Sequence, residues 1–373
     1  MQVGILTFHF GRNYGALLQA YALRETIDLL GYKAVVLHYI PDYYTGCMIS
    51  DESNWLRLGW RTLGPKLAID RRLRTYRFNR FKKKKLHLTK RCRDKRELAQ
   101  LVDKFDAVVV GSDQVWNLNY LKSDDLCYFL DFPIQHEICC ISYAACCGRK
   151  DQPTLYASKV TQLLTKFKHF GVRNEVTNDF VKGLTGRTAT VVADPTLLVD
   201  FNTIEDGYVP ESEYILVYSL GKETLSDCSS LLENLKKELG LQVWAIGDGN
   251  AQWEDTPFPG ADKNWYGISP GRFLSLLKHA ACVVTDSFHG TIFSVKYKKP
   301  FVTLCNAGWR NMRLADLAKR YGIDHRIKDI SHPIDYELLM RADDLGAVQE
   351  KFDAHKTISL KFLRNALGGI AQS

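Results

Sequence analysis

Short apolar runs alternate with longer segments of helical pattern along most of the chain. We expect strands at Val3–Phe8, Ala34–Tyr39, Ala107–Val110, Ile138–Tyr143, His169–Val172, Tyr214–Ser219, Gln242–Ile246, Cys282–Thr285 and Phe301–Leu304. Helices are expected between them, at Ala16–Leu30, Thr154–Lys168, Ser226–Leu239, Gly271–His279, His289–Lys296 and Asn311–Tyr321. This alternation is typical of parallel sheets that are covered by helices.

The pattern occurs twice, and the two halves join near residues 183–199. A chain of 373 residues is also long for a single core, since domains average ~150 residues. We therefore predict an α/β protein with two Rossmann-like domains that face each other across a cleft. The N-terminal domain would comprise residues 1–190 and the C-terminal domain residues 191–345, with a C-terminal helix in residues 346–373. Ligands of open parallel sheets bind beyond the carboxyl ends of the strands, so the loops there should carry the chemistry.

Positive charge is concentrated in one segment. The formal net charge is +8, and Arg71–Lys85 contains nine cations and no acid. Such a segment is either a solvated helix or a surface that attracts a polyanion. No helix-turn-helix, RNP or zinc-finger pattern accompanies it, so nucleic acid is not expected as a partner. An anionic membrane surface or a lipid-linked substrate fits better.

Other features indicate a cytoplasmic protein. The N-terminus lacks the pattern of a signal peptide, and the longest apolar stretch, Ile138–Cys147, is shorter than the ~20 residues that span a bilayer. Ten cysteines without an export signal favour a reducing compartment. The doublets Cys139-Cys140 and Cys146-Cys147 lack C-x2-C spacing, so we expect buried packing and no metal.

Two loops of the first half are candidates for sugar binding. The sequence FHFGRNYGALLQAYAL follows the first strand, but it is not a dinucleotide-binding G-x-G-x-x-G motif. Asn13 could cap the next helix or, with Tyr14, bind an acceptor sugar. The second loop, VVVGSDQVWN, combines an aromatic ring that could stack on a sugar with polar groups for its hydroxyls. Its candidate residues are Asp113, Gln114, Trp116 and Asn117.

Two further loops are candidates for anion binding and catalysis. Arg173 ends a short strand, where its guanidinium could clamp a carboxylate or phosphate or pair with a nearby acid. In TDSFHGTIFS a buried strand delivers His289 to the start of a helix. A histidine there can donate a proton while Ser287, Gly290 and the helix N-terminus hold an anion.

These pieces together resemble the polysaccharide pyruvyl transferase family. The resemblance runs from the first strand to about Tyr321 and rests on NYGALLQAYAL, VVVGSDQVWN, ISYAA, the VR pair at Arg173, ADPTLLV, and TDSFHGTIFS followed by KKPFV. It implies a GT-B-like fold and transfer of a pyruvyl group from phosphoenolpyruvate to sugar hydroxyls, commonly as a cyclic ketal. Arg173 matches the family's donor-binding arginine and His289 its catalytic histidine. Asp113 falls in the loop that supplies an acidic residue.

The chain departs from the family at one position. Many members read arginine–leucine–histidine where this chain has Ser287, Phe288 and His289. Either Arg313, in GWRNMRLADL, takes the place of that arginine, or the donor is held differently.

The resemblance also implies the partners. Phosphoenolpyruvate would be the donor, with no cofactor or metal, and the acceptor a sugar of a capsular or exopolysaccharide precursor, expected on polyprenyl diphosphate at the inner membrane face. Arg71–Lys85 would make peripheral contact with the anionic membrane. Two alternatives stay open: a GT-B glycosyltransferase that uses a nucleotide sugar through AIGDGN (Ala245–Asn250), and a non-catalytic sugar-binding member.

Overall fold

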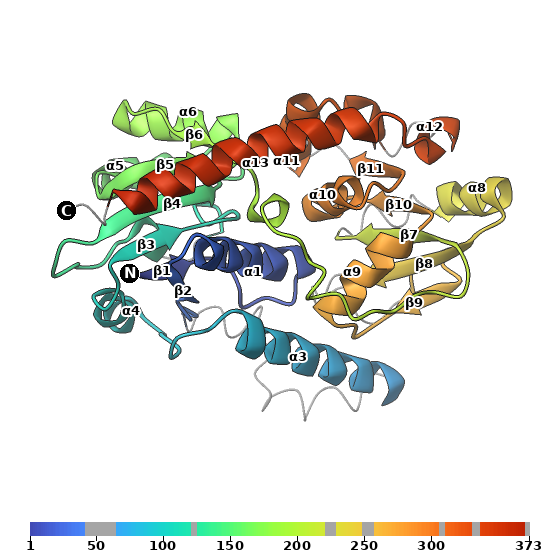
Figure 1. Ribbon diagram of the computed structural model, residues 1–373, viewed down its shortest axis with the longest axis horizontal. Helices are drawn as coiled ribbons and strands as arrows, with labels where there is room; N and C mark the ends of the chain where they lie inside the picture. Colours follow the sequence, from blue (N-terminus) through green and yellow to red (C-terminus); the bar gives the residue numbers. More distant parts are fainter. Residues whose placement is uncertain are drawn as a thin grey trace.

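A computed structural model describes residues 1–41, 65–120, 125–220, 229–247, 257–305, 310–329 and 336–369 of the chain. Its strands form two six-stranded parallel sheets that lie in the two halves of the molecule (Figure 1). Helices pack on both sheets, which confirms the predicted α/β fold class.

The first sheet has the strand order β2-β1-β3-β4-β5-β6. Its strands are β1 (Gln2–Leu6), β2 (Lys33–Val36), β3 (Ala107–Val110), β4 (Cys139–Ala145), β5 (Phe167–Val172) and β6 (Thr190–Val191). Its helices are α1 (Tyr14–Leu29), α3 (Pro65–Lys85), α4 (Lys95–Val102), α5 (Ala157–Leu164) and α6 (Glu175–Thr185), with 3-10 turns η2 (Cys127–Phe129) and η3 (Thr154–Tyr156). Both β3 and β4 are buried throughout, as expected for central parallel strands with helices on both faces.

The second sheet has the order β12-β11-β10-β7-β8-β9. Its strands are β7 (Tyr214–Ser219), β8 (Gln242–Gly247), β9 (Lys263–Trp265), β10 (Cys282–Thr285), β11 (Phe301–Cys305) and β12 (Ile327–Asp329). The remaining elements are the 3-10 turns η4 (Pro195–Leu197) and η5 (Asp324–Arg326) and the helices α8 (Ser229–Leu239), α9 (Pro270–His279), α10 (Phe288–Lys296), α11 (Arg310–Tyr321), α12 (Tyr336–Met340) and α13 (Leu345–Gly368).

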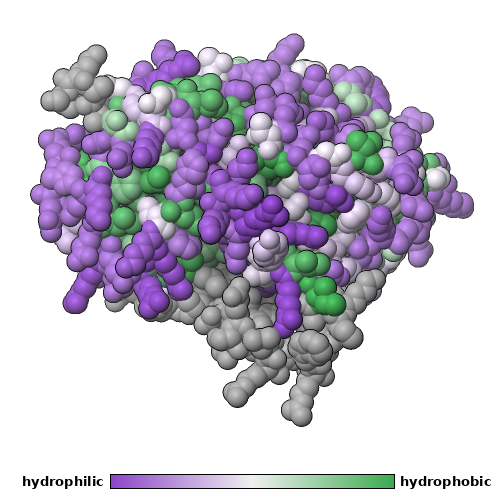
Figure 2. Space-filling view, turned by 60° about the horizontal axis from the view of Figure 1, so that its bottom comes forward, coloured by the Kyte–Doolittle hydropathy of each residue, from purple (hydrophilic) through white to green (hydrophobic). Residues whose placement is uncertain are grey.

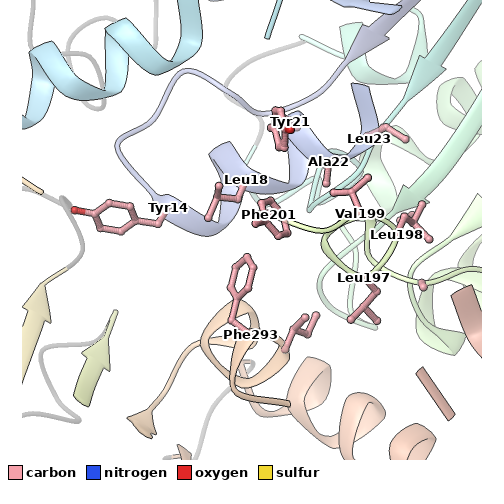
Figure 3. Packing of buried hydrophobic residues seen from close by; sticks show 14 of the residues in the cluster. Tyr14, Leu18, Tyr21, Ala22, Leu23, Leu197, Leu198, Val199, Phe201 and Phe293 are labelled. Carbon is pink, nitrogen blue, oxygen red and sulfur yellow. The ribbon is translucent and has the colours of Figure 1, made fainter. Parts of the chain in front are cut away.

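The connection between the sheets packs into a core shared by both halves. Phe201, just after η4, lies 5.9 Å from the ring of Tyr21 on α1 and 5.4 Å from that of Phe293 on α10. Figure 3 shows Phe201 between the two helices, with Leu197 and Val199 of the same connection beside it. All five side chains are buried, so the two halves share one continuous hydrophobic cluster.

Two helices cross from one half to the other on opposite sides (Figure 1). The C-terminal helix α13 contacts β4 and β5 of the first sheet and α10 and α11 of the second half. On it, His355 bonds the Tyr321 hydroxyl at 2.6 Å and the Val191 carbonyl at 3.2 Å. Helix α3 packs on α9 across the other side, where Arg77 donates to the carbonyl of Gly267.

One expected helix is shorter in the structure. We expected Thr154–Lys168, but α5 ends at Leu164 and β5 already starts at Phe167. Phe167 pairs with Cys140 of β4 and is buried. Sheet pairing therefore outweighs the helical pattern at this end.

The cysteine doublet of β4 follows the alternation of a strand. Cys139 and Cys140 point into hydrophobic clusters on opposite faces of the sheet. All eight cysteines that the structure describes are free, and burial raises the pKa of Cys140 to about 11.

Candidate functional site

Four ionisable side chains from loops beyond the first sheet and β10 meet where the halves face each other. Asp113 follows β3, Arg173 follows β5, Asp194 follows β6, and His289 lies in the first turn of α10 after β10. Ion-pair contacts of 3.3–3.5 Å connect them. The carboxyl ends of parallel strands thus carry the charged groups, as in other open sheets.

Arg173 is the centre of this cluster. The side chain is 3% exposed, and Nη1 lies 3.3 Å from Asp113 Oδ1 and 3.4 Å from Asp194 Oδ2. Its other nitrogens, Nε and Nη2, are buried and have no hydrogen-bond partner among the residues that the structure describes. Buried polar groups normally find partners, and those left without one occur at sites that bind a ligand or water. The guanidinium also packs over the ring of Phe288, 4.7 Å from its centroid.

The charge state of Arg173 follows from its neighbours. Burial alone would lower its pKa, but Cys146, Asp113 and Asp194 outweigh that effect and hold the pKa above its ordinary value. Arg173 is therefore a permanent cation in a water-poor site, where its attraction for an anion is strong.

Asp194 connects Arg173 to His289. Its Oδ1 caps η4, accepting from the Thr196 amide at 3.0 Å and the Thr196 hydroxyl at 2.7 Å. Its Oδ2 lies 3.4 Å from Arg173 and 3.5 Å from His289 Nε2. Burial opposes ionisation, but the charges of His289 and Arg173 and these hydrogen bonds hold the pKa of Asp194 well below its usual range. A carboxylate fixed in this way orients the imidazole beside it.

His289 is held by the start of its helix and by a glycine of the other half. Ser287 caps α10 by accepting from the Gly290 amide at 3.2 Å. The His289 ring rests against Gly15 of α1, where a Cβ would lie 2.2 Å from Nδ1. Position 15 must therefore be glycine for the ring to lie where it does. The glycine of the sequence motif NYGALL thus leaves the space that the His289 ring occupies.

Arg313 of α11 lines the same pocket as Arg173, Asp194 and Phe288. Burial and the neighbouring Arg173 guanidinium lower the pKa of Arg313, so two cations approach each other here. The pocket offers about 20 Å³ of space, the room of about one water molecule. This pocket, which His289 and Asp113 do not line, is therefore nearly closed in this structure.

Ser287 and Gly290, expected to bind the donor, have structural roles here. Ser287 is 1% exposed, and its side chain caps the helix. A Cβ at Gly290 would lie 2.3 Å from Thr285 Oγ1, so glycine lets α10 pack against β10.

None of the five residues expected to bind the acceptor lines this pocket. Trp116 is fully buried and donates to the Tyr128 carbonyl at 3.0 Å, so its face is not available to a sugar. Tyr14 is 1% exposed and stacks on Phe273 at 4.5 Å, which makes it a contact between the halves. The expectation that these two aromatic residues bind a sugar is corrected, because both rings are buried in packing contacts within the protein.

The polar residues of the two loops stabilise the loops themselves. Asn13 caps α1, with its Oδ1 accepting from the Ala16 amide at 2.8 Å. Gln114 and Asn117 are buried and bond each other at 3.1 Å. An acceptor role for these three stays a prediction. The last residues of AIGDGN, 248–250, lie outside the described residues.

Sequence reasoning missed Asp194 as a site residue. It lies within ADPTLLV, where an aspartate before proline reads first as a helix cap, and it does cap η4. Its second oxygen faces the site, which only the path of the chain after β6 reveals.

Two general searches complete the description. Within the described ranges, no group of three or more histidines, cysteines or acids is arranged to hold a metal ion. None of the described helices combines the length and apolar character needed to span a membrane.

A family model of polysaccharide pyruvyl transferases matches residues 13–306. No match is found among curated proteins. Among solved structures, Staphylococcus aureus MnaA with UDP matches with a TM-score of 0.51 and 14% identity, covering 92% of this chain and 90% of that one. A putative UDP-N-acetylglucosamine 2-epimerase from Listeria monocytogenes matches with a TM-score of 0.51 and 12% identity, covering 95% and 90%. At these identities the likeness shows the fold alone, which is GT-B-like. Because the family model covers most of its length, the chain belongs to the polysaccharide pyruvyl transferase family.

Proposed function

We propose that the protein transfers a pyruvyl group from phosphoenolpyruvate to hydroxyls of a sugar in a polysaccharide precursor and forms a pyruvate ketal. The observation that carries the proposal is the buried Arg173, which has two unused nitrogens and lies within one cluster with Asp194 and His289. This combination offers an anion site next to a group able to move a proton.

The donor needs cations on two sides. Phosphoenolpyruvate carries a carboxylate and a phosphate, and arginine binds both with paired hydrogen bonds. Arg173 Nε and Nη2 are free to do so, and Arg313 lines the same pocket. On this proposal, Arg313 supplies the positive charge that Ser287 lacks.

The proton transfers can be assigned to groups of the cluster. His289 gives a proton to the methylene carbon of phosphoenolpyruvate, which becomes a methyl group and leaves a cationic centre at the adjacent carbon. One sugar hydroxyl attacks that centre and loses its proton to Asp113 or to the unprotonated His289. A second hydroxyl then attacks, phosphate departs with the remaining proton, and the ketal ring closes. Each turnover consumes one phosphoenolpyruvate and releases one phosphate.

Asp194 is a positioning residue in this scheme. Its carboxylate faces His289 Nε2 at 3.5 Å and is itself held by two hydrogen bonds from Thr196. The carboxylate therefore lies beside the ring that gives the proton in this scheme.

The acceptor is proposed to be linked to polyprenyl diphosphate, with α3 meeting an anionic membrane. The outer side of α3 exposes Ile69, Leu73 and Tyr76 beside cations, a mixture suited to the interface of a bilayer. Because the pocket is nearly closed, we also expect the two halves to separate when substrates enter.

The test is a reaction with phosphoenolpyruvate and a panel of lipid-linked glycans, read by phosphate release and by mass spectrometry for a pyruvyl ketal. Phosphate release should require an acceptor. His289→Ala should lower turnover by ~10²-fold or more, the usual scale for a lost general acid. His136→Ala, at a half-exposed histidine, is the matched control and should keep wild-type turnover. Release of UDP from UDP-sugars without ketal formation would instead establish the glycosyltransferase alternative, and normal turnover in His289→Ala would remove that residue from the mechanism.

A further inference from the structure

The proposed reaction leaves one arginine of the Arg173 pocket without a role. Arg320 lies on α11, seven residues after Arg313, and both line the pocket. Residues three, four and seven positions apart share one face of a helix, so α11 forms one wall of the pocket. The other residues of this wall are Asp316, Leu317 and Tyr321. Among the described residues that line the pocket, three are arginines and two are aspartates, so cations outnumber acids around this space.

The present partners of Arg320 hold it weakly. Its Nη2 lies 3.5 Å from Glu175 Oε1 on α6 and 3.5 Å from Asp316 Oδ2 on its own helix. A guanidinium that is firmly bound to a carboxylate lies at about 2.7–2.9 Å from it. The Nε atom of Arg320 is buried and has no hydrogen-bond partner among the residues that the structure describes. Arg320 therefore has hydrogen-bond donors that its neighbours use poorly or not at all.

Arg320 also lies between the pocket and solvent. Its side chain is 23% exposed, whereas that of Arg173 is 3% exposed. Glu175, which Arg320 contacts, is more exposed still. Arg320 is thus on the solvent side of the pocket, and Arg173 is on the buried side.

We propose that Arg320, together with Arg313, binds the phosphate group of the donor and makes the site specific for a phosphorylated donor. The inference rests on the proposed function for the identity of that donor. A phosphate carries more negative charge than a carboxylate, and it accepts paired hydrogen bonds from more than one guanidinium. Phosphate is also the group that leaves in each turnover, and the cation nearer to solvent gives it a way out of the site.

Binding in this way requires Arg320 to exchange partners. The pocket has room for about one water molecule, so a phosphate enters only when the wall moves. Glu175 belongs to the first half and Arg320 to the second, so loss of their contact also frees α6 from α11 at this point. An exposed ion pair contributes little to stability, and phosphate can therefore displace Glu175 at small cost.

The first experiment measures binding without turnover. Inorganic phosphate, pyruvate and phosphoenolpyruvate are titrated calorimetrically into wild type, Arg320→Gln and Arg364→Gln, which removes an exposed arginine of α13 and changes the net charge equally. Wild type should bind phosphate. Arg320→Gln should weaken the binding of phosphate and of phosphoenolpyruvate at least about tenfold, the scale of a hydrogen bond to a charged group, and leave pyruvate binding within twofold. Arg364→Gln should change none of the three.

Three results of these titrations would overturn the proposal. They are a wild-type protein that binds no phosphate, an Arg320→Gln protein that binds phosphate as wild type does, and a loss of pyruvate binding as large as the loss of phosphate binding. If Arg320→Gln does not fold, Arg320→Lys keeps the charge without the paired donors and should bind phosphate several-fold more weakly than wild type. Wild-type affinity in Arg320→Lys would then count against the proposal.

Glu175→Gln separates phosphate binding from a bridge between the halves. Both Glu175→Gln and Arg320→Gln remove the ion pair between α6 and α11, but only Arg320→Gln removes the guanidinium. If Arg320 binds phosphate, Glu175→Gln should bind it as tightly as wild type or up to about fivefold more tightly, because a competing carboxylate is gone. Equal weakening in the two variants would make Arg320 a structural bridge and overturn the proposal.

A further titrant identifies the source of the phosphate. UDP represents a nucleotide-sugar donor, and Arg320→Gln should leave its binding within twofold of wild type. Weaker binding of UDP with unchanged binding of phosphoenolpyruvate would assign Arg320 to a nucleotide donor and overturn the proposal. The binding results do not depend on pyruvyl transfer, so failure of the proposed reaction and failure of this site are distinguishable.

Discussion

At the scale of single residues, the site depends on the absence of a side chain at Gly15 as much as on charged groups. The His289 ring occupies the space that a side chain at position 15 would fill. Asp194 then faces its Nε2 from the connection between the sheets, and Arg173 shares the same carboxylate oxygen. The imidazole is thus in contact with two separate parts of the chain, α1 and the connection between the sheets.

Gly15→Ala should lower turnover by about 10²-fold, because a Cβ 2.2 Å from Nδ1 forces the ring out of place and small displacements have costs of that order. The matched control is Gly183→Ala in α6, where a Cβ meets nothing within 4 Å. The control should keep full turnover and gain up to about 1 kcal/mol in free energy of unfolding. Steady-state kinetics and urea unfolding of both variants provide the check, and wild-type turnover in Gly15→Ala would contradict the placement of the ring.

At the scale of elements, the two faces of α3 present different side chains. Its inner face presents Arg74, Phe78 and Lys82, four residues apart, to the loop after β1. Its outer face exposes apolar and basic side chains. Figure 2 shows the side of the molecule that carries α3, where hydrophilic side chains dominate and hydrophobic ones gather in small areas.

Reversing the outward cations should separate membrane contact from catalysis. The four exposed positions to change to glutamate are Arg72, Arg80, Lys83 and Lys84. Each contributes about 1 kcal/mol near an anionic surface, screened within a Debye length of ~10 Å at 0.1 M salt. We expect weaker binding to anionic liposomes at low salt and a higher KM for a lipid-linked acceptor, with kcat on a soluble analogue near normal.

The control for this prediction reverses four exposed lysines elsewhere, which gives the same change in net charge: Lys33, Lys104, Lys237 and Lys361. The control protein should bind liposomes far better than the α3 variant. Equal losses in the two proteins would mean that net charge alone governs binding, and equal losses on both acceptors would implicate α3 in the active site.

At the scale of the whole molecule, the two halves are joined in three places. The connection through Phe201 fills the middle, and α13 and α3 cross on opposite sides. The exposed link between Glu175 of α6 and Arg320 of α11, at 3.5 Å, is much weaker than the buried contacts. Arg320 also lines the Arg173 pocket, so this weaker contact lies beside that pocket.

The stability of the molecule should decrease on mild acidification. Burial chiefly lowers the pKa of His9, His38 and His355 in the folded protein, to about 3 for His9 and about 4 for His38, against about 6.5 in an unfolded chain. The contribution of these histidines to the free energy of unfolding is complete above pH 6.5. Below that pH the unfolded chain binds protons that the folded protein does not bind, and stability falls until the pH reaches the pKa values of the folded protein.

For His9, which is 1% exposed, the expected slope is about 1.4 kcal/mol per pH unit between pH 6 and 4. Urea unfolding at pH 7.5, 6.0 and 5.0 gives the measured slope, and His9→Gln should flatten it by up to that amount. Asp194, whose pKa is lowered, affects stability only below about pH 3.9 and does not disturb this window. An unchanged slope in His9→Gln would contradict the buried neutral state of His9.

The sequence alone determined the fold class and most strands and helices. It also predicted Arg173, Arg313 and His289 as site residues, and that role stays a prediction. Alternation of apolar runs with helical segments is a local signal, and it predicted β3, β7 and β10 with their bounds. Tertiary structure decided the rest, because a side chain's role depends on what packs against it. Trp116 was expected to stack on a sugar but is buried in the core, while Asp194, which the sequence analysis did not single out, lies between Arg173 and His289. Charge and spacing can be read along the chain, but only the folded chain determines which ionisable groups are buried together, as Arg173 and Asp194 show.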